Sequence, residues 1–278
     1  MVAAVFSGRV FVTGCKKKMK DLHNPLKEAL KAGKLQVGMW CTLGSPVSTE
    51  LFAGAGFDWL LVDLEHSPND MLSALHQHRA ASAYETEIVV RPPSQDINLI
   101  KQFLDVGIRS FLFPMVQDVA QAKALVAATR YPPDGIRGLS MVQRANRYGR
   151  VKNYHANAHN EIFIAAQIET GAAAEVARDI AMVEGIDTIF VGPSDLSADL
   201  GHLGVPSNET VQATIRKTLE LSKDVGIQTG VLAPIEADAR RYIDWGARFV
   251  AVGTDVGLLA KHGDALAASF KDGDRPRG

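Results

Sequence analysis

Ionisable side chains stand at the ends of several short apolar runs in this chain of 278 residues. His66 follows one run, Arg91 closes the next, Glu169 closes a later one, and Asp195 follows the run after that. If these runs are parallel strands of a barrel, their C-terminal ends share one rim and the four side chains converge there. Such a rim would combine cation-binding carboxylates, a fixed positive charge and a group that can move a proton.

Glu169 and Asp195 end successive runs, so their carboxylates can be neighbours. Adjacent carboxylates repel each other unless a positive charge lies between them. A hard divalent cation such as Mg²⁺ or Mn²⁺ takes one or two carboxylates and fills its remaining positions with water and substrate oxygens. The alternative is that each acid only caps the helix that follows it, and the pattern leaves both interpretations open. Zinc is not indicated, because no Cys-x-x-Cys pattern occurs and the His-x-x-x-His spacing of His155 and His159 falls in a long connection rather than at a strand end.

Arg91 and His66 also have two interpretations each. Arg91 precedes the rigid pair Pro92-Pro93 and could clamp a substrate carboxylate or stabilise an oxyanion. It could instead form a salt bridge with an acid at the same rim. His66 could act as a general base or lie in a solvated loop.

The segment 137–152 carries four arginines and a lysine, with Tyr148 among them. It belongs to the one long connection, residues 131–159, and long connections are often functional. These cations could bind an anionic substrate tail. We favour the alternative, a subunit interface or a solvated loop.

Eight short apolar runs alternate with stretches of helical spacing, which predicts a single (β/α)₈ barrel over residues 24–278. Several runs do not alternate with polar residues, as is typical of strands covered on both faces. An open doubly wound sheet is the rival fold, but no strand is followed by Gly-x-Gly-x-x-Gly or a phosphate loop. The expected strands cover residues 37–43, 59–63, 88–91, 110–114, 162–169, 188–192, 228–233 and 249–253. The expected helices cover residues 48–55, 96–106, 118–129, 171–183, 209–225 and 235–245.

Composition narrows the class of protein. Thirty Lys and Arg against 31 Asp and Glu argue against a nucleic-acid partner. No apolar run approaches the roughly 20 residues needed to cross a bilayer, which argues against a membrane partner. Two cysteines fit a reducing compartment, so we expect a cytoplasmic protein. Residues 1–23 are expected to form a disordered leader, with Met19 as a candidate natural start.

Six motifs, in order between Leu26 and Lys261, resemble the HpcH/HpaI class II pyruvate aldolases. They are Ala53-Gly54-Ala55-Gly56-Phe57-Asp58-Trp59 with Val62-Asp63-Leu64-Glu65-His66, Val90-Arg91-Pro92, Arg130-Tyr131-Pro132-Pro133, Gly135-Ile136-Arg137-Gly138, Gln167-Ile168-Glu169-Thr170 and Gly192-Pro193-Ser194-Asp195-Leu196-Ser197. Each motif is weak alone, but the ordered set is specific.

The resemblance implies a barrel of the phosphoenolpyruvate/pyruvate superfamily, assembled as a homo-hexamer with the last helix exchanged between subunits. It implies reversible, metal-dependent aldol cleavage of a 4-hydroxy-2-oxo acid to pyruvate and an aldehyde, with Mg²⁺, Mn²⁺ or Co²⁺ as the metal. The site roles that it implies are Glu169 and Asp195 as metal ligands, Gln167 with the backbone of Ser194 and Asp195 for pyruvate binding, Arg91 for enolate stabilisation, His66 as the base, and Asp105 as the carboxylate that raises the basicity of His66.

Other activities stay open at this point. A related carbon–carbon lyase, such as an oxaloacetate decarboxylase or an acyl-CoA lyase, would use similar residues, and a barrel could also bind a keto acid without turnover. A Schiff-base aldolase is not indicated, because no lysine stands at these strand ends. Leu64 replaces the glycine of many sugar-acid members, and we expect this bulky residue to narrow or reshape the pocket.

Overall fold

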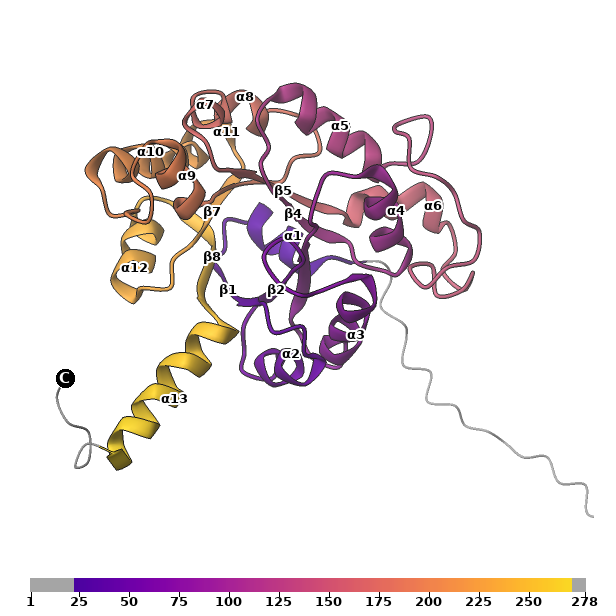
Figure 1. The fold of residues 1–278 in the computed structure, drawn as a ribbon. Coiled ribbons are helices and arrows are strands. Elements are labelled where there is room, and N and C mark those ends of the chain that lie inside the picture. The colour runs from indigo at the N-terminus through magenta and orange to yellow at the C-terminus, as the bar shows by residue number, and fades with distance from the viewer. Residues whose placement is uncertain (1–22, 272–278) are drawn as a thin grey trace, which may run out of the picture.

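The computed structural model describes residues 23–271, without the side chains of residues 222 and 223. Eight parallel strands pair in chain order and the last pairs with the first, which closes a barrel (Figure 1). The strands are β1 (Gln36–Cys41), β2 (Trp59–Asp63), β3 (Glu87–Arg91), β4 (Ser110–Phe113), β5 (Phe163–Ile168), β6 (Thr188–Val191), β7 (Gln228–Leu232) and β8 (Ala247–Thr254). The predicted (β/α)₈ barrel is confirmed, whereas residues 1–22 of the predicted leader lie outside the described residues.

Polar side chains begin most of the helices that follow strands. Ser45, Asp70, Asp96, Asp118 and Thr170 each accept a hydrogen bond from a backbone N–H in the first turn of the next helix. The helices are α1 (Pro25–Lys31), α2 (Pro46–Ala53), α3 (Met71–Ala81), α4 (Ile97–Asp105), α5 (Val119–Thr129), α6 (Tyr154–Asn157), the 3₁₀ helix η1 (Ala158–Glu161), α7 (Gly171–Glu175), α8 (Ala177–Ala181), α9 (Pro193–Asp199), α10 (Glu209–Glu220), α11 (Ser222–Val225), α12 (Glu236–Asp244) and α13 (Asp255–Lys271). The segments expected as single helices over 171–183 and 209–225 each divide in two, and the long connection contains α6 and η1.

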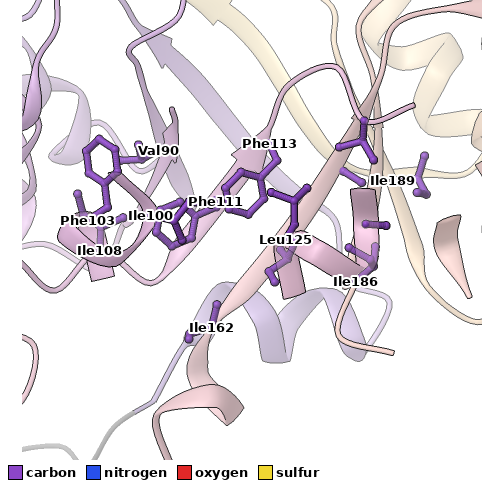
Figure 2. Packing of buried hydrophobic residues seen from close by; sticks show 14 of the residues in the cluster. Val90, Ile100, Phe103, Ile108, Phe111, Phe113, Leu125, Ile162, Ile186 and Ile189 are labelled. Atoms are coloured by element: carbon purple, nitrogen blue, oxygen red, sulfur yellow. The ribbon is translucent and has the colours of Figure 1, made fainter. Parts of the chain in front are cut away.

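Alternate residues of the strands that end at the site enter different cores. Leu61 and Val89 join the aromatic side chains that fill the barrel. Among these side chains, Trp59 of β2 contacts Phe249 of β8. Val62 and Val90, which follow Leu61 and Val89, instead pack against the surrounding helices. Figure 2 shows part of this outer layer, in which side chains of β3 and β4 pack beside side chains of α4 and α5. Side chains of β2 and β3 therefore alternate between the barrel interior and the helix layer.

The two ends of the barrel differ. Leu26 and Leu30 of α1 pack into the interior core beneath the strands, so the N-terminal end is closed by apolar side chains. At the chain's other end, α13 extends away from the barrel (Figure 1), and its residues 256–271 lack a buried side chain. Among the described residues, no helix is both long and apolar enough to cross a membrane.

Candidate active site

The alternation of the strands decides which rim residues face the barrel mouth. Asp63 continues the inward phase of Trp59 and Leu61, and Arg91 continues that of Val89. On β5, Gln167 and Glu169 continue the phase of interior residues in the same way. The structure brings six of the seven predicted site residues to the C-terminal end of the barrel, namely His66, Arg91, Gln167, Glu169, Ser194 and Asp195.

Arg91 is held by a carboxylate on the neighbouring strand. Its Nε and Nη2 donate to Asp63 Oδ1 at 2.8 Å and Asp63 Oδ2 at 2.6 Å, and both residues are buried. Trp40 lies beneath the pair, with its indole N–H 3.4 Å from Asp63 Oδ2 and its ring 5.2 Å from the guanidinium carbon. Burial by itself raises the pKa of Asp63, but the Arg91 hydrogen bonds and charge outweigh it and leave that pKa below its ordinary value. The guanidinium is therefore a permanently charged, oriented group.

Glu65 gives Arg91 a second carboxylate neighbour. Arg91 Nη1 lies 2.9 Å from Glu65 Oε2, and the same oxygen lies 3.9 Å from His66 Nε2. Burial raises the pKa of Glu65 despite the nearby charge of Arg91. His66 itself extends toward solvent, with 66% of its side chain exposed. Its position therefore depends mainly on the backbone of the loop that carries it.

Glu169 is a buried carboxylate at the end of β5. Its Oε2 accepts from the Met115 N–H and its Oε1 from Gln167 Nε2, both at 2.8 Å. Burial raises its pKa to about 7, and the negative charges of Glu65 and Asp195 add to this rise. The close approach depends on Gly192, because a Cβ there would lie 2.6 Å from Glu169 Oε1.

The helix-capping alternative for the two acids is not supported. Helix α7 is capped by Thr170, whose hydroxyl accepts from the Ala173 N–H, and the Glu169 carboxylate points elsewhere. Helix α9 begins at Pro193 after Gly192, so Asp195 is already its third residue and lies exposed at the rim. Both acids are therefore available to a ligand at the barrel mouth.

These residues fit a hard divalent cation. The negative charge of Asp195 adds to the raised pKa of both Glu65 and Glu169, and a cation between these acids would relieve the repulsion. Gln167 Oε1 is buried without a hydrogen-bond partner among the described residues. Within residues 23–271, no group of three or more His, Cys, Asp or Glu residues could by itself hold a metal ion. The chain thus offers a partial set of oxygen ligands, which leaves positions for water and substrate.

Asp105 lies at the opposite end of the barrel. It closes α4, which runs back from the rim, and its Oδ1 accepts from Arg137 Nη2 at 2.8 Å. Arg137 is fully buried, stacks over Tyr131 at 4.4 Å and has Asp105 as its carboxylate partner. The structure therefore does not bring Asp105 to His66 within one chain, and the role implied for it stays a prediction.

The cations of segment 137–152 are also remote from the mouth in this chain. Arg144 donates to the Val106 carbonyl at 2.7 Å, beside the start of β4. With His78 and Arg109 it lines a cavity of about 630 Å³ at the N-terminal end. Burial and these arginines lower the pKa of His78 to about 3. A role for these cations toward a substrate tail is not supported within one chain.

Two further residues correct the expectations from sequence. The side chain of Leu64 is buried in the layer between strands and helices, so it does not narrow the pocket as expected. The alternation of side chains along β2 predicts this outward position of Leu64, because Leu64 stands between the inward-facing Asp63 and Glu65. The sequence predictions assign no role to Asp63, although the same alternation places it inside the mouth beside Arg91.

Comparisons with known proteins give matches over most of the chain. A model of the HpcH/HpaI aldolase/citrate lyase family matches residues 36–262. The chain is 46% identical over 248 residues to the 5-keto-4-deoxy-D-glucarate aldolase of Klebsiella pneumoniae, across 89% of this chain and 97% of that relative. It is 48% identical over 247 residues to the pyruvate aldolase of Rhizobium etli, across 89% and 97%. The structure of an HpcH/HpaI aldolase/citrate lyase family protein from Burkholderia cenocepacia superposes with a TM-score of 0.87 at 34% identity, covering 89% of this chain and 99% of that one.

Proposed function

Because the chain belongs to the HpcH/HpaI aldolase/citrate lyase family and is an aldolase-type carbon–carbon lyase, we propose that it cleaves a 4-hydroxy-2-oxo acid reversibly to pyruvate and an aldehyde. The observation that supports this reaction best is the Arg91 guanidinium, fixed by two carboxylates beside the Glu169–Gln167 pair. Breaking the C3–C4 bond leaves negative charge on the pyruvate half, and an oriented, water-shielded cation is suited to that charge.

Glu169 and Asp195 are the residues that would hold a divalent cation, Mg²⁺, Mn²⁺ or Co²⁺, which supplies Lewis-acid polarisation of the 2-oxo group when bound. Gln167 and the backbone of Ser194 and Asp195 would bind the pyruvate half. The unpartnered Gln167 Oε1 supports this assignment, because a buried amide oxygen without a partner is costly until a ligand reaches it. These groups would fix the pyruvate half of the substrate and leave the half that becomes the aldehyde toward solvent.

His66 is the proposed base that removes the proton of the 4-hydroxyl group. It lies at the mouth on the loop after β2, one residue from the Glu65 that contacts Arg91. A base at this place would act on the substrate half that extends out of the barrel, where bond cleavage releases the aldehyde. Its exposure also lets it exchange the proton with water between turnovers.

The experiment is a coupled assay for pyruvate release from a panel of 4-hydroxy-2-oxo acids, with and without Mg²⁺, Mn²⁺ or Co²⁺. The panel includes 5-keto-4-deoxy-D-glucarate, which is a 4-hydroxy-2-oxo acid when numbered from its keto end. Metal-dependent release from panel members supports the proposal. Release from oxaloacetate alone would favour a decarboxylase. Formation of acetyl-CoA from a 3-hydroxyacyl-CoA, without pyruvate release from the panel, would favour the acyl-CoA lyase. Turnover of none of these substrates would favour a barrel that binds keto acids without turnover.

The partner that we propose for α13 is a second copy of this chain, within a homo-hexamer. Val256, Leu259, Leu266 and Phe270 are apolar and exposed on this helix, which extends away from its own barrel (Figure 1). Burying such side chains against another subunit would be favourable. Light scattering at micromolar concentration tests this assembly, and a stable monomer would contradict it. The cytoplasmic location expected from the cysteines stays a prediction.

A further inference from the structure

We propose that Asn69 and Gln77 are positioning residues that hold the loop of Glu65 and His66 in its working conformation, an inference that rests on the proposed role of His66 as the base. This loop covers residues 64–69, between β2 and the Asp70 cap of α3. It has no helical or strand structure of its own. Its conformation must therefore be fixed by side chains.

The Asn69 amide is the centre of a hydrogen-bond network at the end of this loop. Its Nδ2 donates to the Asp63 carbonyl at 2.7 Å and to Ser67 Oγ at 2.8 Å. Its Oδ1 accepts from Gln77 Nε2 at 2.7 Å and from Ser73 Oγ at 2.9 Å. The Ser67 hydroxyl also donates to the Asp63 carbonyl. All four hydrogen-bonding positions of the amide are used, so Asn69 joins both ends of the loop to α3.

Gln77 carries this network into the protein. Its side chain is fully buried on α3, in the layer that also contains Ala74 and Ala81. Its Oε1 accepts from Thr49 Oγ1 of α2 at 2.8 Å, while its Nε2 reaches Asn69. A buried amide costs free energy unless it is fully hydrogen-bonded, so an apolar side chain would suit packing alone better. We therefore attribute the presence of an amide at position 77 to its hydrogen bond with Asn69, which fixes the loop.

His66 needs this support because its own side chain is mostly exposed, and its nearest charged neighbour, Glu65, lies 3.9 Å away. The backbone of the loop therefore sets where its ring lies. A displacement of about 1 Å in a catalytic group can cost about 100-fold in rate. Loosening the loop should consequently lower the rate of bond cleavage, while Arg91 and Gln167 still bind the pyruvate half of the substrate.

The test uses Asn69→Ala, Gln77→Leu and the milder Thr49→Val in the full-length enzyme, with the best substrate of the panel. We expect kcat to fall about 10- to 100-fold for the first two and less for Thr49→Val, with KM unchanged. The matched control is Gln212→Leu, since Gln212 also joins two helices, through Tyr242 and Arg241, but on the far side of the barrel. It should affect thermal stability without changing kcat.

A double-mutant cycle separates positioning from general loosening. If Asn69 acts through His66, Asn69→Ala should cause no further loss of kcat in the His66→Ala background. An equal loss in both backgrounds would overturn the proposal, because the amide would then act on the Asp63–Arg91 pair or on the fold. Wild-type kcat in Asn69→Ala and Gln77→Leu, beside a crippled His66→Ala, would overturn this proposal alone. An unimpaired His66→Ala would refute the base itself, and the positioning role with it.

Discussion

Asp63 and Arg91 are register partners on β2 and β3, and their side chains meet through two parallel hydrogen bonds of 2.8 and 2.6 Å. A second pair has the same fork geometry at the opposite end of the barrel, where Arg109 donates to Glu87 at 3.0 and 2.8 Å. One pair lies at the mouth and the other at the N-terminal end. The barrel therefore contains its own control for the effect of breaking such a pair.

Asp63→Asn is expected to lower kcat/KM for pyruvate release about 100-fold, because the neutral amide no longer orients the Arg91 charge toward the developing anion. Glu87→Gln should destabilise the fold to a similar degree, since it disrupts an equivalent pair with Arg109, yet leave kcat/KM unchanged. Denaturant unfolding and steady-state kinetics on both variants give the comparison. Equal kinetic losses in the two variants would show that Asp63 serves the fold rather than the site.

Glu169→Gln and Asp195→Asn are each expected to abolish metal-dependent turnover while the barrel stays folded. Either change removes a carboxylate oxygen charge that a hard cation requires. Calorimetric titration with Mn²⁺ measures affinity directly, and circular dichroism reports the fold. A variant that keeps wild-type metal affinity and activity would remove that residue from the proposed ligand set.

The raised pKa of Glu169 predicts a pH dependence with a definite sign. Because the folded protein holds this proton up to a pKa of about 7, against an ordinary value of 4.5, it binds more protons than the unfolded chain between these values. Stability of the metal-free protein should therefore fall as pH rises through that interval. Metal affinity should rise over the same range, because the carboxylate must be deprotonated to bind.

Chemical denaturation of metal-free protein at several pH values checks this dependence, with Glu169→Gln as the matched control. The glutamine variant has no carboxyl group to titrate at this position, so its stability should lack the component of slope that Glu169 gives. Identical pH profiles for the two proteins would contradict the assignment.

Asp105→Asn is expected to lower the free energy of unfolding by about 3 kcal/mol, because it deprives the buried Arg137 of its charge partner. Urea unfolding measures the loss. The sequence resemblance predicts a different result, a downward shift of the acid limb of the pH–rate profile through His66. Unchanged stability together with that shift would favour the role implied by the resemblance.

The sequence by itself determined the barrel and most of its rim. Apolar runs and helical spacing are local signals, and each strand end carries its polar residues within a few positions. His66, Arg91, Glu169 and Asp195 could therefore be placed together from the sequence. Strand alternation, which is also a property of the sequence, further predicts that Leu64 points to the helices and Asp63 to the barrel mouth.

Only the tertiary structure decided the partners of residues that meet across long stretches of chain. Asp105 and Arg137 are 32 positions apart, and Thr49 and Gln77 are 28 apart on different helices. Which side chains meet there depends on how helices and the long connection pack on the barrel. No local pattern encodes that packing, because the free energy of each contact depends on the burial that the whole fold creates.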